Sequence, residues 1–337
     1  MTIAILYTLP TKRVIKSTYL VADEDTVLSA QKIALSLSAK GVTPLLVALS
    51  EDHISETIRS IQADLIINLI DWTGADLPLS LDAMDELTKR SIPFVGATKE
   101  NFTLVDKVTM KESLDRHHLP TAKWQIFRTG KEHVSKDLTY PVLVKLAREH
   151  CSVGIEKTSF VTKEEDLLPV VVDRLERFSQ DVYVEEFING REFQITVLED
   201  ESGPYMLPPA EIIYKPTDIP EFLTFSERWN IHDPHYQRSD TALAQLSQKQ
   251  LDLFSELSKK TFIALGFRDF TRIDVRLKSE FECLILEANP NPGLDDDELY
   301  SMTISARAAG LTFSDFLWRI ITSALKRKGQ TVSTFES

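Results

Sequence analysis

The pattern of apolar and polar positions over residues 1–97 predicts strands that alternate with helices. Strand-sized apolar runs at 3–6, 42–49, 64–70 and 92–95 alternate with segments of helical spacing at 25–40, 54–61 and 79–90. This alternation favours a parallel sheet with helices on both faces. We therefore expect residues 1–97 to form an N-terminal α/β domain.

Two further units are expected, over residues 98–180 and 181–330. The pattern in the first predicts helices at 106–117 and 164–178 and strands at 124–127 and 142–146. In the second it predicts strands at 182–187, 192–198, 269–277 and 282–288 and helices at 247–264 and 314–328. The chain as a whole is expected to combine the α/β and α+β classes in three domains.

Two connecting segments carry specific expectations. Asn189-Gly190, between the strands at 182–187 and 192–198, is a turn dipeptide that favours a hairpin. Residues 221–242 are long, polar and aromatic without a clear period, which predicts a mobile loop.

The composition is that of a folded globular protein, with 43% hydrophobic and 26% charged residues among 337. The net charge of −13 disfavours nucleic acid as a partner, because binding it depends on Lys and Arg that neutralise phosphates. The apolar runs are too short to span a membrane, and we expect no signal peptide. Cys151 and Cys283 fit neither a disulfide framework nor a metal site, so reduced thiols are expected. These features favour a cytoplasmic protein.

The strongest chemical signal is a pair of short motifs near the C-terminal end. One is Arg-Ile-Asp at 272–274, and the other is Glu-Ala-Asn-Pro-Asn-Pro-Gly at 287–293. Side chains on a strand alternate between its two faces. On the first strand, one face is expected to carry Phe270, Arg272, Asp274 and Arg276. On the partner strand, the polar face carries Glu287 and Asn289, and the core face carries Leu284, Leu286 and Ala288.

Two carboxylates and an amide oxygen on one surface form a hard-oxygen set, which Mg²⁺ prefers together with nucleotide phosphates. The neighbouring Arg272 can stabilise charge that develops on a transferred phosphoryl group. A surface strand pair with a solvated acidic face is the alternative interpretation. The apolar run before Glu287 and the restrained turn after Asn289 oppose it. The sequence therefore predicts metal ligands at Asp274, Glu287 and Asn289.

Three other segments can contact a nucleotide, although each has a plainer interpretation. Lys107 opens a predicted helix and Lys145 ends a predicted strand, where lysines suit phosphate contacts but are more often only solvated. The loop after Lys145 carries Ser152 and a glycine, which let backbone amides approach phosphate oxygens. Glu185 and Glu186 end a strand and can accept hydrogen bonds from adenine or ribose. By themselves they are more often a solvated pair.

These motifs follow one another in a specific order. Asp-Lys before a helix is followed by Pro-Val-Leu-Val-Lys, a Ser-Val-Gly-Ile loop, Val-Glu-Glu-Phe-Ile-x-Gly-Arg-Glu, Arg-x-Asp and Glu-x-Asn-x-x-Pro-Gly. The set resembles the ATP-grasp superfamily, and within it the D-alanine–D-alanine ligases, over residues 92–299. The resemblance implies an ATP-grasp fold with an N-terminal parallel α/β domain, a small lid domain and a C-terminal mixed-sheet domain.

The resemblance also implies a role for each motif residue. Lys107 and Lys145 look like the phosphate-binding lysines of the family. Ser152 lies in the loop after Lys145, whose backbone amides can approach the phosphates. The implied adenine and ribose contacts are Glu185, Ile188 and Glu192, and Glu186 and Phe187 supply the backbone of the linker. The implied ligands of two Mg²⁺ ions, for which Mn²⁺ is an alternative, are Asp274, Glu287 and Asn289. Arg272 resembles the arginine that holds the acyl-phosphate and tetrahedral intermediates.

The implied reaction joins a small-molecule carboxylate to an amine at the expense of ATP. The carboxylate attacks the γ-phosphate, and the amine then displaces phosphate from the acyl phosphate. The family's homodimer, formed through the N-terminal domain, is a further expectation. Neither nucleic acid nor a membrane is an expected partner.

Departures from the family cluster around the amino-acid pocket. Cys151 stands where the family has its catalytic serine. In place of the family's Tyr-x-x-Lys-Tyr loop the chain has Phe-Ser-Glu-Arg-Trp, in which Arg228 keeps the positive charge and Trp229 lacks the phenol hydroxyl. The candidate catalytic residues are Arg272, Cys151, Ser152 and Arg228. For Cys151, the favoured interpretation is a tolerated small residue, because a thiol donates weaker hydrogen bonds than a hydroxyl and nothing indicates a nucleophile.

Further departures concern the substrates. Residues 71–76 replace the family's His-Gly and Gly-Glu-Asp-Gly elements, and its N-terminal glutamate has no counterpart in residues 6–16. The acidic run Asp295–Glu298 stands where the family binds the carboxylate of its second substrate. Four acids there would repel a carboxylate and attract an amine, a guanidine or a polyamine, unless they only form a solvated helix start.

Four functions are compatible with these residues. The first is a carboxylate–amine ligase for amino acids or small amines outside cell-wall synthesis. The others are a true D-alanine–D-alanine ligase, an ATP-grasp kinase that phosphorylates an alcohol, and a non-catalytic nucleotide-binding module. The acidic run argues against the kinase, and the full set of motif residues argues against the non-catalytic module.

Overall fold

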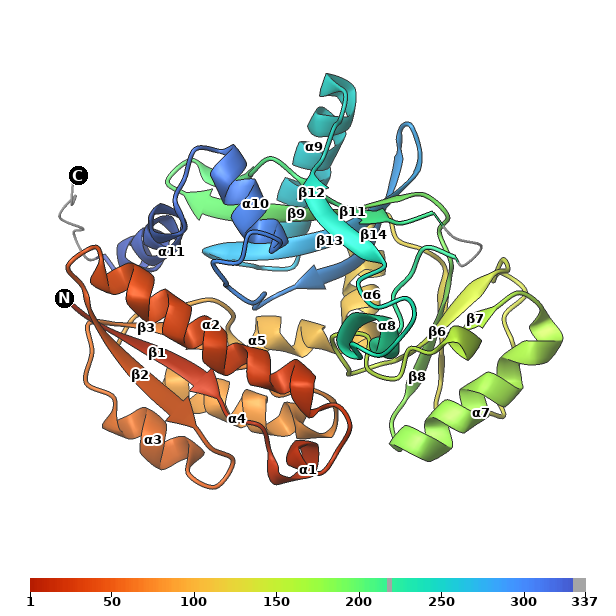
Figure 1. The fold of residues 1–337 in the computed structure, drawn as a ribbon, viewed down its shortest axis with the longest axis horizontal. Coiled ribbons are helices and arrows are strands. Elements are labelled where there is room, and N and C mark those ends of the chain that lie inside the picture. The colour runs from red at the N-terminus through yellow and green to blue at the C-terminus, as the bar shows by residue number, and fades with distance from the viewer. Residues whose placement is uncertain (217–219, 330–337) are drawn as a thin grey trace.

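The computed structural model describes residues 1–216 and 220–329 and arranges them around three β-sheets (Figure 1). The first sheet has four parallel strands in the order β2-β1-β3-β4. They are β1 (Thr2–Thr8), β2 (Thr43–Leu49), β3 (Leu65–Leu69) and β4 (Phe94–Val95). The helices of this part are α1 (Lys12–Ile15), α2 (Leu20–Ser38), α3 (Ile54–Ser60), α4 (Leu77–Thr88) and α5 (Lys99–Phe102).

Both faces of the first sheet are buried. Ile3 packs with α2 in one core, and Ala4 packs with α3 and α4 in another. Successive side chains of a strand point to opposite faces, so a strand that is covered on both sides reads as a continuous apolar run. The predicted parallel sheet with helices on both faces is confirmed.

The second sheet is small and antiparallel, with the order β5-β8-β6-β7. Its strands are β5 (Trp124–Phe127), β6 (Val142–Leu146), β7 (Phe160–Val161) and β8 (Val182–Glu186). Helix α7 (Leu167–Phe178) covers one face, where Val171 shares a core with Val144 and Val184. Helix α6 (Lys107–Arg116) joins this sheet to the third, because Val108 packs near Tyr183 while Met110 enters the core of the third sheet.

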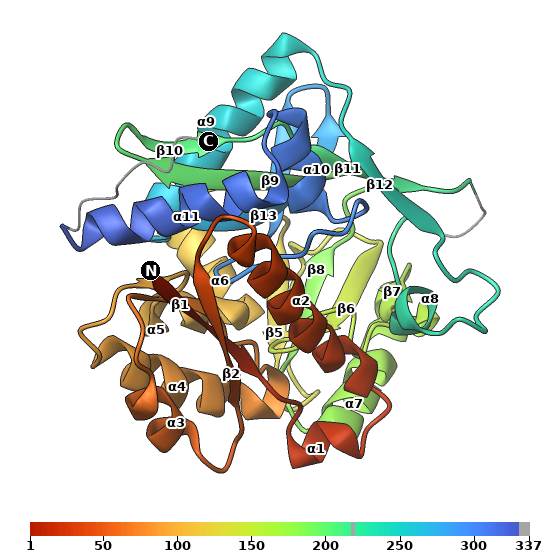
Figure 2. The same cartoon turned by 60° about the vertical axis from the view of Figure 1, so that its left-hand side comes forward.

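The third sheet has the order β12-β11-β9-β13-β14, with β10 paired to β9. The strands are β9 (Arg191–Asp200), β10 (Gly203–Met206), β11 (Ala210–Tyr214), β12 (Ser239–Leu243), β13 (Phe270–Ser279) and β14 (Glu282–Asn289). Helix α9 (Gln248–Ala264) packs on one face. Helices α10 (Ser301–Ala308) and α11 (Phe313–Arg327) pack on the other, and Figure 2 shows α11 beside α2.

The remaining described elements are short. Helix α8 spans Phe225–Trp229, and 3₁₀ turns lie at Gly74–Asp76, Thr103–Val105, Lys157–Ser159 and Glu164–Asp166. None of the helices in residues 1–216 and 220–329 has the length and apolar character needed to cross a membrane.

The expected hairpin at Asn189-Gly190 is wrong, because β8 and β9 belong to different sheets. Neither Asn189 nor Gly190 has the positive φ that a tight Asn-Gly turn requires. Gly190 is required instead because the backbone passes very close to Leu277 of β13. A Cβ atom at Gly190 would lie 2.2 Å from the carbonyl oxygen of Leu277, so only glycine lets the chain cross over β13 here.

The expected loop at 221–242 also differs from the structure, which places α8 and most of β12 within it. Thr224 and Glu227 form a capping box that starts α8, a local signal in the sequence that a search for periodicity overlooks. Glu227 is fully buried, and its carboxylate lies 3.5 Å from the guanidinium of Arg238. The segment is therefore anchored at both ends.

A buried aspartate joins the first sheet to the third. Asp269, at the start of β13, is fully buried and accepts hydrogen bonds from the Gly96 amide at 3.1 Å and the Ser323 hydroxyl at 3.0 Å. Its carboxylate also pairs with Arg327 of α11, which in turn donates to the carbonyl oxygen of Phe94 in β4 at 2.9 Å. One carboxylate thus connects β4, β13 and α11.

We predict that Asp269→Ala lowers the free energy of unfolding by about 2–4 kcal/mol, because it leaves buried donors and the Arg327 charge without a partner. Urea denaturation followed by circular dichroism measures the change. Glu201→Ala is the matched control, since it removes an exposed partner of the neighbouring Lys326 and should leave stability close to that of the wild type. Equal stability of the two variants would contradict this role of Asp269.

Candidate active site

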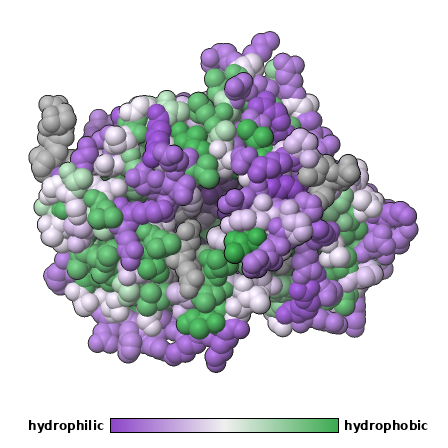
Figure 3. Space-filling model, viewed as in Figure 1, coloured by the Kyte–Doolittle hydropathy of each residue, from purple (hydrophilic) through white to green (hydrophobic). Residues whose placement is uncertain are grey.

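A cavity of about 500 Å³ lies where the three sheets meet. Figure 3 shows it as a hollow in the middle of the face viewed in Figure 1. Its walls include Asp71 after β3, Lys145 of β6, Glu185 of β8, and Asp274 and Glu287 of the third sheet. Side chains from parts of the chain that are far apart in sequence therefore converge on one space, as expected for a ligand site.

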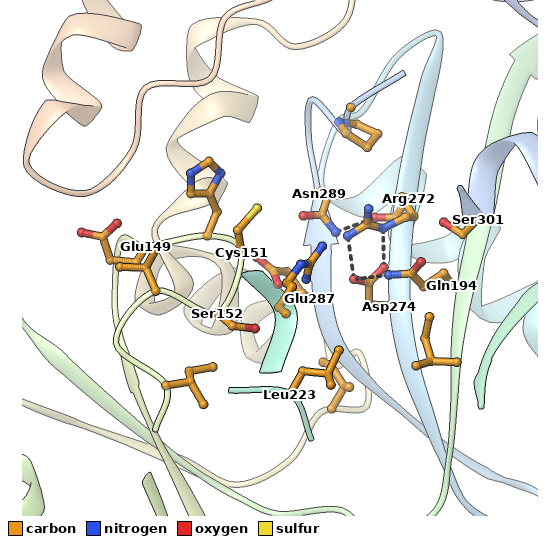
Figure 4. Close-up of a pocket in the computed structure, with 18 of the residues that line it drawn as sticks. Glu149, Cys151, Ser152, Gln194, Leu223, Arg272, Asp274, Glu287, Asn289 and Ser301 are labelled. Atoms are coloured by element: carbon orange, nitrogen blue, oxygen red, sulfur yellow. Dashed lines mark hydrogen bonds and ion pairs between the residues drawn. The ribbon is translucent and has the colours of Figure 1, made fainter. Parts of the chain in front are cut away.

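The β13–β14 pairing brings the predicted metal ligands together. Asp274 lies directly opposite Glu287, and Arg272 lies directly opposite Asn289. Arg272 forms a two-point ion pair with Asp274, at 2.7 Å from Nε to Oδ1 and 2.9 Å to Oδ2 (Figure 4). Gln194 of β9 donates to the same carboxylate at 3.4 Å. Two carboxylates, two amides and a guanidinium thus share one wall of the cavity.

The predicted core face of β14 needs a correction. A β-bulge interrupts the register after Asp274, so Val275 pairs with Ile285 and Leu286 is the extra residue. Ile285 and Cys283 are buried in the core together with Ala288, whereas Leu286 lines the cavity next to Glu287. The expected inward direction of Leu284 and Leu286 is wrong, because strict alternation does not survive a bulge.

The charges on this wall are set by burial and by neighbouring cations. Burial raises the pKa of Asp274, and the attraction of Arg272 only partly offsets this. Burial also opposes ionisation of Glu287, but Lys107 and Lys145 outweigh it and lower the pKa of that carboxyl. The Lys107 ammonium lies 3.4 Å from Glu287 Oε1. A cation between the two carboxylates would favour the ionised form of both.

A second group of buried charges surrounds Glu185. Lys145 Nζ lies 2.5 Å from Glu185 Oε1, and Lys111 Nζ lies 2.9 Å from Oε2. The Tyr183 hydroxyl donates to the same carboxylate. Burial opposes the charge on Glu185, but the two lysines outweigh it and hold the pKa of the carboxyl far below its usual value. Glu185 therefore anchors Lys145 at the cavity wall and Lys111 in the interior behind it.

Lys111 is a residue of this group that the sequence prediction missed. It is fully buried on α6, one helical turn after Lys107, so both side chains lie on one face of the helix. It also donates to the Thr121 hydroxyl at 2.5 Å. The spacing of four residues on a predicted helix was the available signal.

The end of β8 and the linker after it line the cavity with Glu186, Phe187 and Ile188. Its amides are used within the protein, since Glu186 N donates to Lys123 O and Phe187 N donates to Pro141 O, both at 2.9 Å. The Glu186 side chain accepts from the Thr139 amide at 2.8 Å. These contacts fix the backbone of the linker to the small sheet.

Arg276 is a second residue that the sequence prediction missed as part of the site. Its guanidinium donates to the carbonyl oxygen of Ile188 and to Glu192 Oε2, both at 2.7 Å. Glu192 also accepts from the Tyr214 hydroxyl at 3.2 Å. Arg276 thereby holds the linker and Glu192 together at one end of the cavity.

The loop after β6 forms the opposite wall. Cys151 and Ser152 both have positive φ, at 50° and 64°, and both line the cavity. The Trp229 indole of α8 donates to the carbonyl oxygen of Cys151 at 3.1 Å, while the exposed Arg228 stacks over the Trp229 ring and also lines the cavity. The structure therefore brings the candidate catalytic residues of the loop and of α8 to one place.

The acidic run does not face the cavity. Asp295 is buried and accepts from Lys32 at 2.6 Å and from Ser29 at 3.0 Å. Asp296 and Glu298 both pair with Arg307 of α10. None of the four acids lines the cavity, where Tyr300 and Ser301 lie instead. The hypothesis that this run attracts a cationic substrate is therefore wrong, because none of the four acids lines the cavity and three of them pair with Lys32 or Arg307.

The chain resembles known proteins over most of its length. The model of the family described as D-ala D-ala ligase C-terminus matches residues 114–322. A D-alanine–D-alanine ligase from Carboxydothermus hydrogenoformans is 29% identical over 81% of this chain and 85% of its own length. An uncharacterised protein, y4sG, from Sinorhizobium fredii is 28% identical over 72% of this chain and 69% of its own length.

Solved structures show the same fold at low sequence identity. A D-alanine–D-alanine ligase from Bacillus anthracis complexed with ATP superposes with a TM-score of 0.73 at 17% identity, covering 98% of this chain and 99% of its own. The VanG D-Ala:D-Ser ligase from Enterococcus faecalis gives 0.70 at 18%, covering 96% and 99%. Since the family model also matches more than half of the chain, this protein belongs to the D-alanine–D-alanine ligase family and is an ATP-grasp ligase that forms carbon–nitrogen bonds.

Proposed function

We propose that this ligase converts a small carboxylate into an acyl phosphate at a Mg-ATP site on β13 and β14 and then joins the acyl group to an amine. The observation that carries the proposal is the direct opposition of Asp274 and Glu287, with Arg272 and two lysines at the same cavity. Amino acids or small amines are the proposed substrates.

The donor set fits Mg²⁺. Asp274, Glu287 and Asn289 offer carboxylate and amide oxygens on one wall, and burial raises the pKa of Asp274 in spite of Arg272. The described residues contain no cluster of three His, Cys, Asp or Glu side chains that could hold a metal alone. That agrees with metal ions that take their other ligands from phosphates and water. When bound, two such ions, or Mn²⁺ in their place, would neutralise charge on the phosphates.

The remaining residues position the two reactants. Lys107 and Lys145 would contact the phosphates, together with the backbone of the Ser152 loop. Glu185, Glu186, Phe187, Ile188 and Glu192 form the proposed adenine and ribose end. Arg272 would hold the developing charge of the acyl phosphate, and Arg228 with Cys151 and Ser152 would close the opposite wall. Positioning and charge neutralisation would then supply most of the rate enhancement.

A second candidate is a true D-alanine–D-alanine ligase. The observation that favours it is that the acidic run does not line the cavity. Ser301 lines it instead, on the same wall as Arg272 (Figure 4). A hydroxyl and a guanidinium could bind a substrate carboxylate. D-alanine-dependent phosphate release decides between the two, because efficient turnover with D-alanine alone would replace the first proposal.

Three broader expectations remain proposals. They are the division of the chain at residues 97 and 180, a location in the cytoplasm, and a homodimer formed through the N-terminal part. Light scattering coupled to size exclusion would test the last of these.

We predict that Glu287→Gln lowers turnover by about a hundredfold or more, because it removes a charged ligand of the proposed metal ions. The measurement is ADP release in a screen of amino-acid and amine pairs. Glu282→Gln on the same strand is the matched control, since that residue is exposed and pairs only with Lys278 on the surface. Full activity of Glu287→Gln, with an unchanged circular dichroism spectrum, would refute the metal assignment.

We also predict that hydroxylamine, added with ATP and the carboxylate substrate, yields a hydroxamate. Hydroxylamine intercepts an acyl phosphate but does not react with a phosphorylated alcohol, so the product separates a ligase from an ATP-grasp kinase. Colorimetric detection with ferric iron measures it, and chelation of Mg²⁺ should abolish it. ATP binding without cleavage for any acceptor would instead support a non-catalytic module.

A further inference from the structure

Lys111 is a buried charge to which the proposed reaction assigns no task. Its side chain is fully buried on α6, behind the part of the cavity wall that Lys145 and Glu185 form. Lysines are almost never fully buried unless their charge is paired, because taking an ammonium group out of water is costly. Since a ligand in the cavity does not reach Lys111, any role in binding must act through a neighbouring residue.

The Lys111 amine is held in its charged form by three oxygen atoms. Nζ lies 2.9 Å from Glu185 Oε2. It also lies 2.5 Å from the Thr121 hydroxyl and 3.4 Å from the carbonyl oxygen of Ile285. The Thr121 hydroxyl donates its own hydrogen to that carbonyl at 2.8 Å, so Lys111 is the donor toward Thr121. Three acceptors match the three hydrogens of an ammonium group, whereas a neutral amine has two. Burial lowers the pKa of Lys111, and the Glu185 carboxylate opposes this effect.

Glu185 divides its carboxylate between two lysines. Oε1 accepts from Lys145 at 2.5 Å, whereas Oε2 faces Lys111 and also accepts from the Tyr183 hydroxyl. The two lysines differ in their access to the cavity, because the side chain of Lys145 is 17% exposed and that of Lys111 is 0% exposed. The group contains two positive charges and one negative charge. Its net positive charge is therefore offered to the cavity through Lys145.

The ion pair between Lys145 and Glu185 competes with any phosphate contact of the same ammonium group. If Lys145 turned from the carboxylate to a phosphate, Glu185 would lose that partner while only 2% exposed. A buried carboxylate without a cation is strongly disfavoured. Lys111 removes this obstacle, because it stays on Oε2 whichever way Lys145 points. Without Lys111, the remaining pair would be neutral and Lys145 would be the only cation on Glu185.

We propose that Lys111 is a positioning residue of the phosphate site, which neutralises Glu185 from behind so that Lys145 can direct its charge to a bound triphosphate. The proposal rests on the proposed function, in which Lys145 contacts the phosphates of ATP. Lys111 itself touches neither nucleotide nor substrate. It differs in this from Lys107, one helical turn earlier, whose side chain lines the cavity and lies 3.4 Å from Glu287.

The test measures the binding of inorganic tripolyphosphate to the full-length protein by isothermal titration calorimetry in the presence of Mg²⁺. This probe has no adenine, so the proposed adenine contact of Glu185 does not enter the result. Lys111→Met, which keeps an unbranched side chain, should weaken binding at least about tenfold because the net positive charge is lost. Lys260→Met is the matched control. It also removes one lysine, which is exposed on α9 and paired with Glu256, and it should leave binding unchanged.

The decisive variant combines Lys111→Met with Glu185→Gln. It removes one charge of each sign, which restores the net positive charge on Lys145, and its dissociation constant should return to within about threefold of the wild-type value. Restored packing cannot explain such a recovery, because the double variant lacks more native contacts than the single one. Glu185→Gln alone should bind tripolyphosphate at least as tightly as the wild type, and it tests the proposal even where Lys111→Met does not fold.

Wild-type affinity in Lys111→Met, no recovery in the double variant, or weaker binding by Glu185→Gln would each overturn the role of Lys111. Failure of the proposed function appears differently. A wild-type protein that binds no tripolyphosphate would refute the phosphate site together with this role. Binding with the expected charge effects but without hydroxamate formation from ATP would refute the ligase reaction and still support the role of Lys111.

Discussion

The antiparallel pairing of β13 with β14 is the constraint on which the site depends. Two carboxylates can share metal ions only if they are held at a fixed separation despite their mutual repulsion. Backbone hydrogen bonds between the strands supply that force, because they place Asp274 across from Glu287. The bulge after Asp274 then turns Leu286 toward the cavity while the core face keeps Ile285. In a regular ladder Leu286 would face the core and Ile285 would face the cavity.

Most of the positively charged side chains near this wall are paired with carboxylates of the protein. Lys145 and Lys111 are fixed by Glu185, Arg276 by Glu192, and Arg272 by Asp274. Lys145, Arg276 and Arg272 are therefore held at the cavity wall by carboxylates before any ligand arrives, and Lys111 lies buried behind it. Such preorganisation spares a bound triphosphate the cost of gathering mobile side chains. It also explains why a chain with a net charge of −13 can offer a site for a polyanion.

Much of the fold and of the site could be predicted from the sequence, for identifiable reasons. The buried strands of the first sheet are continuous apolar runs, and β5 and β6 begin and end at the predicted residues. The motif residues from Lys107 to Asn289 were found because their order is distinctive. Lys111 was missed because its partner Glu185 lies on a strand that α6 meets only in the folded chain, and Arg276 was missed because the pairing that sets it opposite Glu192 joins strands far apart in sequence. The misread acidic run shows the same limit, since Arg307 and Lys32 neutralise it from other elements.

The contacts of Asp269 with β4 and α11 have a consequence for how ligands enter. They tie the first sheet to the third at one buried point, whereas the small sheet is joined to the third through α6 and the crossing at Gly190, which packs against the carbonyl oxygen of Leu277. A direct backbone bond also joins the first part of the chain to the loop after β6, because Gly74 N donates to Arg148 O at 2.8 Å. Any movement that widens the cavity by separating that loop from the first sheet would have to break this bond.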